Sequence, residues 1–199
     1  MNTVENGASL LVDMYKEVAP ALRAALAACK QIEVENEEPL TLVGQPYDVD
    51  GPDALARMLA EVRRSTSLWV SCDFSETSVY GPEGNAWFRH VHDMGHMLYD
   101  LGFDAESENT LHQYLWDALR RTRVFQVAPQ AHKAAAWLVY QADTKGQTDF
   151  YEKFGEFPED QTAFVSMWVE HWGKNFGATL TDRFFRSNSC TPVFQSTPA

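Results

Sequence analysis

Apolar residues recur at helical spacing along most of the chain. Over residues 8–32 they fall three or four positions apart, as at Leu11, Met14 and Val18, which predicts an amphipathic helix. Pro20 lies inside this segment. Because proline lacks the amide hydrogen that a helix interior uses, we expect Pro20 to kink or divide the helix.

The same spacing predicts further helices in the remainder of the chain. They cover residues 53–64, 85–101, 105–123, 129–143 and 160–185. Gly102 follows the helix over 85–101, and glycine there is a common C-terminal stop.

Strand signals occur only in the N-terminal half. Residues 39–43 and 67–74 are short and rich in β-forming residues, and residues 77–80 are candidates to pair with the second of these segments before the turn at Gly81. The expected fold class is therefore mainly α, a helical bundle with a small β element in the N-terminal half. We find no repeat and expect a single domain over 1–199, with 187–199 as a loosely held polar tail.

Composition supports a folded protein with an acidic surface. The 199 residues are 45% hydrophobic and 13% aromatic, which is typical of a globular domain with a sizeable core. The net charge of −12 repels phosphate backbones, so extended nucleic-acid binding is not expected. A small anionic substrate stays compatible with this charge if a metal ion holds it, and an acidic face can also serve a protein partner.

The cysteines and the apolar segments bear on the compartment. Cys29, Cys72 and Cys190 are scattered and form no CxxC pair, which favours a reducing compartment. The polar start of the chain is unlike a signal peptide, and no apolar run approaches the roughly 18 residues of a membrane span. We therefore expect a cytoplasmic protein that does not enter the membrane.

His92 and His96 are the strongest chemical signal. Histidines at i and i+4 share one helix face, with Cβ atoms about 5–6 Å apart, and such a pair can bind one metal ion, as in the HExxH helix. Asp93 stands where HExxH has glutamate. The residue type is compatible with either a metal ligand or a general base, and the histidines could instead be structural.

The residues after Gly102 extend this pattern. His112 lies four positions after Glu108, so the two share a face if the segment is helical, and the short connection at 102–104 predicts a helical hairpin that brings them back. Gly95 costs a helix about 1 kcal/mol relative to alanine, so we expect it to permit close approach of another element. The sequence predicts one divalent transition-metal ion (zinc, manganese or iron) bound by His92, His96 and His112 with Glu106 or Glu108.

Residues 143–147 follow a predicted helix and have two interpretations. In one they form a loop at the mouth of the metal site that offers Asp143, Lys145 and Gln147 to a ligand. In the other they are an ordinary helix stop with Gly146 as the breaker. Lys145 and Gln147 are the candidate substrate-binding residues.

Several of these segments form one ordered signature. It consists of the segments 88–96, 102–103, 106–112 and 144–147. The signature resembles the series F-R-x-V-H-D-x-x-G-H, E-x5-H and T-[RK]-G-Q in an uncharacterised group of tailed-bacteriophage and mobile-element proteins, over residues 85–161. One residue of that series is missing here between Asp93 and Gly95. The resemblance implies a phage origin, host cytoplasm and a metal-like site, and it implies no particular reaction.

A second resemblance concerns the HD-domain phosphohydrolases. Residues 92–96, His-Asp-Met-Gly-His, are similar to their H-D-[IM]-G-[HK] segment, and Ala142-Asp143 is similar to their later A-D pair. Those enzymes also use an upstream histidine, and no histidine precedes His90 here.

Three functions follow as hypotheses. The leading one is a phage metal-dependent hydrolase of a phosphorylated small molecule or nucleotide, in which the ion acidifies a bound water and Asp93 orients or deprotonates that water. Lys145 and Gln147 would hold the substrate. The second is a non-haem iron oxygenase built in a helical bundle. The third is a non-enzymatic acidic protein that binds and inhibits a host factor, with structural histidines.

Overall fold

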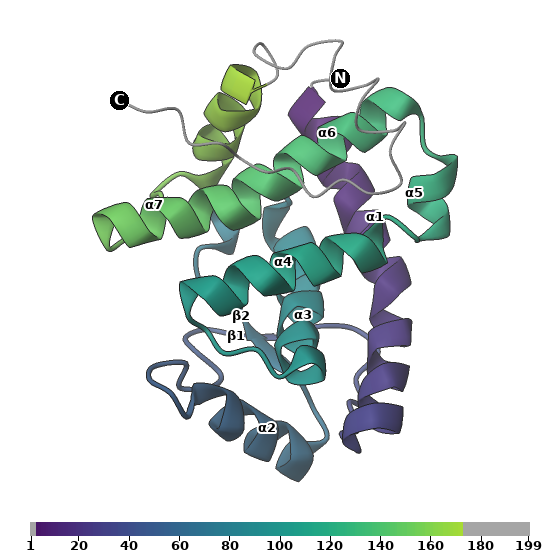
Figure 1. Cartoon of the computed structure of the whole chain (residues 1–199), viewed down its shortest axis with the longest axis vertical. Coiled ribbons are helices and arrows are strands. Elements are labelled where there is room, and N and C mark those ends of the chain that lie inside the picture. Colours follow the sequence, from purple (N-terminus) through teal and green to yellow (C-terminus); the bar gives the residue numbers. More distant parts are fainter. Residues whose placement is uncertain (1–2, 173–199) are drawn as a thin grey trace.

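A computed structural model describes residues 3–172 and confirms a mainly α fold (Figure 1). The helices are α1 (Thr3–Ala25), α2 (Ala54–Ser65), α3 (Gly81–Tyr99), α4 (Ala105–Leu119), α5 (Arg123–Val127), α6 (Gln130–Gln141) and α7 (Gln147–Phe154). Residues 161–172 are also helical. The strands are β1 (Leu40–Leu42) and β2 (Trp69–Ser71). The rest of the helix expected over 160–185, and the tail expected at 187–199, lie outside the described residues.

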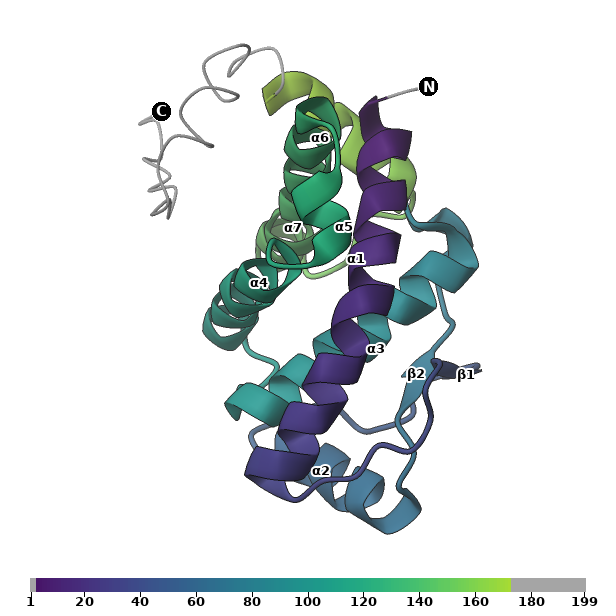
Figure 2. The same cartoon turned by 90° about the vertical axis from the view of Figure 1, so that its right-hand side faces the viewer.

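Helix α1 runs along the length of the molecule and packs against α3 and α6 (Figure 2). Its apolar stripe is fully buried at Leu11 and Met14, and each such side chain stabilises the fold by about 1.5–3 kcal/mol. At Gly7 the backbones of α1 and α6 nearly touch, because an added Cβ atom would lie 2.6 Å from the carbonyl oxygen of Ala135. The crossing of these two helices therefore depends on a residue without a side chain.

Helix α1 differs from its expected form at both ends. It begins at Thr3, five residues earlier than expected, because Val4 and Gly7 are buried and extend the apolar stripe. Pro20 does not divide it: the helix continues to Ala25 and then becomes a π-helical turn over Leu26–Lys30. The proline is exposed, so the backbone carbonyl it leaves without a partner is accessible to water.

The β element is a two-stranded parallel sheet in which Thr41 pairs with Val70. The expected pairing of residues 77–80 with β2 is wrong, since residues 75–77 form a short 3-10 turn that leads into α3. The guanidinium of Arg89 on α3 donates to the carbonyl oxygens of Ser71 (2.6 Å) and Asp73 (2.8 Å). These bonds hold the end of β2 against α3.

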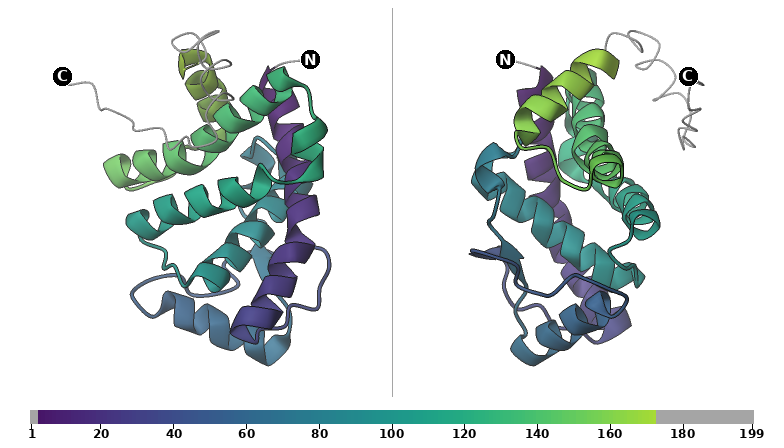
Figure 3. Two further views of the ribbon diagram at one scale, coloured as in Figure 1. Left: turned by 45° about the vertical axis from the view of Figure 1, so that its right-hand side comes forward. Right: turned by 90° about the vertical axis from the view of Figure 1, so that its left-hand side faces the viewer.

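Helix α4 turns back over α3 (Figure 3). Helix α3 ends at Tyr99, and Asp100 takes the left-handed conformation (φ 55°) that was expected of Gly102. Asp104 then caps α4 by accepting from the amide of Ser107 at 3.0 Å. Gly95 faces α4, where an added Cβ would lie 2.6 Å from a methyl carbon of Leu111. The close approach expected at Gly95 is therefore present.

Both interpretations of residues 143–147 are wrong. The chain neither stops nor forms a loop there, but passes from α6 through a π-helical turn, Ala142–Gly146, into α7. Gly146 has ordinary helical angles (φ −59°) and lies against the helix at 161–172, since an added Cβ would be 3.3 Å from the indole nitrogen of Trp168. Short π-helical turns within helices often mark functional sites.

Within residues 3–172, none of the helices combines the length and the apolar character needed to span a bilayer.

Substituting Gly7 tests the crossing of α1 and α6. We expect Gly7→Ala to lower the free energy of unfolding by about 1–3 kcal/mol, because the clashing atom belongs to the backbone and cannot rotate away. The control is Ser9→Ala in the exposed part of the same helix, which should be neutral or stabilising by about 0.5 kcal/mol. Urea denaturation measures both, and equal stability of the two variants would contradict the tight crossing.

Candidate metal centre

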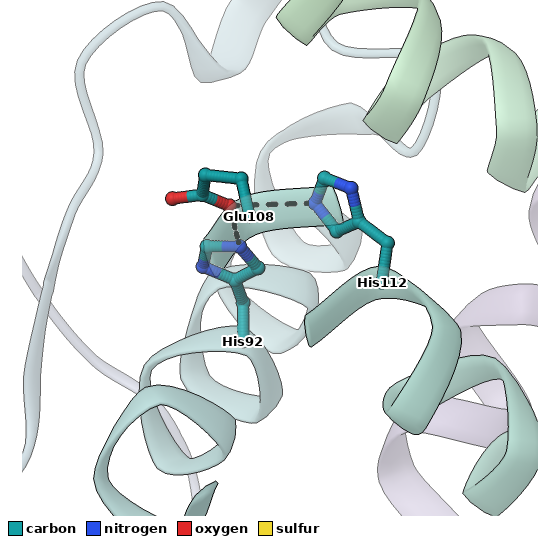
Figure 4. Close-up of side chains that lie close together, drawn as sticks. All are labelled: His92, Glu108 and His112. Carbon is teal, nitrogen blue, oxygen red and sulfur yellow. Dashed lines mark hydrogen bonds and ion pairs between the residues drawn. The ribbon is translucent and has the colours of Figure 1, made fainter. Parts of the chain in front are cut away.

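Helices α3 and α4 bring His92, Glu108 and His112 together in a partly buried group (Figure 4). One ligand atom from each residue lies within 4.8 Å of the others, and such a group could hold a metal ion. The spacing explains the convergence, because His112 stands one turn after Glu108 on α4 and both face His92 on α3.

Glu108 is the centre of the arrangement. Its Oε2 atom lies 3.0 Å from Nε2 of His92 and 3.5 Å from Nε2 of His112. Its other oxygen, Oε1, lies 3.3 Å from Nε2 of His96. One carboxylate thus faces three imidazole nitrogens from two helices.

His96 lies at the edge of this group, outside the set of three whose ligand atoms all lie within 4.8 Å of one another. The ring is fully buried, and Nδ1 lies 2.9 Å from the carbonyl oxygen of Leu101. A carbonyl oxygen only accepts hydrogen bonds, so Nδ1 carries the proton and donates it. In the neutral ring, Nε2 then carries a lone pair that is directed at Glu108. This nitrogen has no hydrogen-bond partner. A cation bound between the two acceptors would satisfy both, and a backbone bond of this kind is what orients metal-binding histidines.

Asp93 lies beside the group rather than within it. Its Oδ1 atom is 3.6 Å from Nδ1 of His92, on the side of the ring opposite Glu108. A carboxylate behind a metal-binding histidine fixes the ring and its tautomer. The orienting role of Asp93 stays a prediction, and its carboxylate is close enough to His92 to fill it.

Burial and charge determine the protonation of the two histidines nearest Glu108. Burial disfavours the charged ring of His92, but the Glu108 charge and hydrogen bonds to Asp93 and Glu108 outweigh it and raise its pKa to about 10. Burial, together with the His92 charge, lowers the pKa of His112 to about 3. Burial of Glu108 is likewise outweighed by His92, so its pKa is held far below the usual range. The group therefore contains an ion pair beside a neutral imidazole.

The structure does not bring three of the predicted site residues to this group. Glu106 is exposed, which leaves Glu108 as the acidic residue of the cluster. Lys145 forms an ion pair with Asp149 at 2.6 Å. Gln147 is buried, and its amide nitrogen donates to Oδ1 of Asp143 at 2.7 Å, so its side-chain amide faces the protein interior.

The sequence offered the carboxyl of Asp143 as part of a loop and, by resemblance, as part of the A-D pair of the HD-domain phosphohydrolases; in the structure it is buried in the core. Burial raises its pKa to about 7, although hydrogen bonds from Tyr80 and Gln147 oppose the shift. Because this pKa is higher than that of the same carboxyl in the unfolded chain, protonated Asp143 contributes its full stability to the fold below the unfolded-state pKa. That contribution is lost as the pH rises through about 7. Ionised Asp143 then costs the fold about 4 kcal/mol. Its spacing of four residues from Gln147 was the signal available in the sequence.

Comparison of the chain with protein-family models, with curated proteins and with solved structures finds no significant match. The chemistry of the group therefore has to be argued from its own residues. Imidazole nitrogens with one carboxylate suit zinc, manganese and iron, so the donor set fits the kinds of ion expected from the sequence.

Metal affinity should depend steeply on pH. Since the pKa of His92 is raised to about 10, the ring is protonated below that pH, and the proton must leave Nε2 before it binds an ion. We expect the association constant for Zn²⁺ to rise about tenfold per pH unit between pH 6 and pH 9. Calorimetric titration at constant ionic strength measures this slope, and a pH-independent constant would rule out His92 as a ligand.

Two neighbouring glutamates provide a matched test of the ligand set. Glu108→Gln should remove stoichiometric Zn²⁺, because it takes away the carboxylate that faces His92, His96 and His112 together. Glu106→Gln should keep it, since that side chain is exposed two residues earlier on α4. Metal analysis after dialysis gives both results, and loss of metal in the Glu106 variant alone would reverse the assignment.

Proposed function

We propose that the protein is a metal-dependent hydrolase of a phosphorylated small molecule or nucleotide. The observation that carries the proposal is the convergence of three histidines on Glu108. A divalent ion bound there would acidify a water molecule and polarise a phosphoryl oxygen. That a tailed phage or mobile element encodes this protein stays a prediction from the sequence resemblance.

Exposure indicates the side from which a substrate approaches. The side chains of His92, Asp93 and Glu108 are 16%, 19% and 18% exposed. Those of His96 and His112 are 0% and 7% exposed. The open side therefore lies at His92 and Glu108, next to Asp93. Asp93 lies across the His92 ring from Glu108, so its carboxylate would hold the ring that binds the ion, while the ion itself would acidify the attacking water.

Lys145 is the positively charged group proposed to bind an anionic substrate despite the acidic surface. The charge of Lys145 contributes to lowering the pKa of His112, so its ammonium group acts on the centre even while it pairs with Asp149. Exposed ion pairs of this kind contribute little stability, so the lysine can exchange Asp149 for a phosphate group. Lys145 therefore remains the substrate-binding candidate, whereas buried Gln147 positions Asp143.

A second candidate function rests on the composition of the group. His92, His112 and Glu108 are two histidines and one carboxylate, the set that non-haem iron oxygenases use with open coordination positions. Metal analysis separates the candidates, because zinc or manganese favours hydrolysis and iron favours oxygenation. A protein that takes up none of these ions would favour a partner-binding role with structural histidines.

Asp93→Asn tests the proposed hydrolase directly. The substitution keeps the shape of the side chain and removes the negative charge behind His92, so we expect a roughly 10- to 100-fold lower turnover, the loss typical of a residue that orients a metal ligand, with bound metal and thermal midpoint preserved. The assay is phosphate release from a panel of nucleotides and sugar phosphates by the zinc- or manganese-loaded protein. Loss of metal from the variant would instead make Asp93 a ligand, and the absence of phosphate release from any substrate would count against hydrolysis.

A further inference from the structure

A second polar cluster lies in the core next to the metal centre. It consists of Tyr15, Tyr80, Asp143 and Gln147, from α1, the start of α3, the π-helical turn and α7. Gln147 donates to Asp143 at 2.7 Å, the hydroxyl of Tyr80 donates to the same carboxyl, and the hydroxyls of Tyr80 and Tyr15 are 3.3 Å apart. Three of the four side chains are buried and Tyr80 is half-buried.

Two routes of direct contact join this cluster to the metal centre. On one side, the hydroxyl of Tyr140 donates to the carbonyl oxygen of His112 at 2.8 Å, which ties the end of α6, just before Asp143, to α4. On the other side, the ring of Phe88 lies between Tyr80 and His92, with centroid distances of 5.7 Å and 5.4 Å. The Asp143 carboxyl is therefore linked to His92 through the side chains of Tyr80 and Phe88.

We propose that Asp143 is an outer carboxylate of the metal centre, which does not bind the ion but strengthens its binding through its buried negative charge. This proposal rests on the metal centre of the proposed function. It makes Asp143 a residue that tunes the affinity of that centre for its ion. A buried carboxylate is costly unless its charge is used, and the helices require none at this position.

The surroundings of Asp143 make its charge effective. The ionisable groups that act on it are Tyr15 of α1, Tyr80, Arg89 and His92 at the start of and within α3, and Tyr140 of α6. Burial raises the pKa values of the three tyrosines, so these side chains remain neutral at physiological pH. Arg89 is already engaged by two backbone carbonyls. An ion at His92 would thus attract a carboxylate that few other charges screen.

The coupling should appear only when Asp143 is ionised. Because its pKa is raised to about 7, the carboxyl is neutral at pH 5.5 and mostly anionic at pH 8.5. By linkage, the ion lowers the pKa of Asp143 by as much as the anion strengthens metal binding. At an effective dielectric constant of about 20, the negative charge of Asp143 changes the dissociation constant of the bound ion by on the order of tenfold.

The test compares Zn²⁺ binding by the wild type and Asp143→Asn, by competition with a chelating dye at both pH values. The dissociation constant of the variant should equal that of the wild type at pH 5.5. At pH 8.5 it should be about tenfold larger, which means weaker binding. Ionised Asp143 also favours the charged ring of His92, but the ion carries one positive charge more than the proton it displaces, so the variant still binds Zn²⁺ more weakly. Asp149→Asn, a change of the exposed carboxylate paired with Lys145, should leave the ratio near unity throughout.

A second variant protects the test against a folding defect. Tyr80→Phe removes one donor that lowers the pKa of Asp143, so the strengthening of Zn²⁺ binding should begin at a higher pH than in the wild type. Equal constants for the wild type and Asp143→Asn at pH 8.5, or the same weakening at both pH values, would overturn the proposal. Wild-type protein without Zn²⁺ binding would overturn this proposal and the metal centre together. Normal coupling without phosphate release would count against the hydrolase alone.

Discussion

The contact between α3 and α4 at Gly95 is the constraint on which the candidate site depends. A methyl carbon of Leu111 occupies the place that a side chain at position 95 would need, 2.6 Å from a built Cβ. His92 and His96 flank this glycine on α3, and Glu108 and His112 flank Leu111 on α4. Metal–nitrogen bonds of about 2.0–2.1 Å tolerate little displacement, so the spacing of the two helices decides whether the four side chains can share an ion. The contact at Gly95 therefore determines both how α3 and α4 pack and where the side chains of the candidate site lie.

Much of this arrangement follows from the sequence because it is local. The repeats of four residues between His92 and His96, and between Glu108 and His112, place each pair on one helix face, and the connection between the helices is too short to separate them widely. The glycine within the first pair already indicated a close approach. The sequence left both Glu106 and Glu108 open, although Glu108 alone of the two stands four residues before His112, because it did not show which side of α4 faces α3. That choice depends on the rotation of α4, which buried Leu111 and Leu115 fix against α3.

The parts that sequence reasoning missed depend on contacts between distant segments. The π-helical turn after α6 carries no local signal that distinguishes it from a helix end, since Gly146 is equally suited to stop a helix. It is helical because the helix at 161–172 packs against Gly146 and because Tyr80 and Gln147 satisfy the buried carboxyl of Asp143. The parallel sheet is a similar case: β1 and β2 are separated by α2 in the sequence, and Arg89 on α3 holds the end of β2.

Two buried polar groups of this protein destabilise its fold, and this destabilisation indicates that they have a function. His96 keeps a buried lone pair with no donor, directed at a carboxylate oxygen 3.3 Å away. Asp143 is buried with a pKa of about 7, and the groups that donate to it, Tyr80 and Gln147, are neutral. Natural sequences depart from full satisfaction of buried polar groups chiefly where function requires it. These two groups lie in adjoining clusters, and a cation beside Glu108 would relieve both, the first by direct contact and the second by its field. Buried His90, whose ring nitrogens also have no hydrogen-bond partner, belongs to neither cluster.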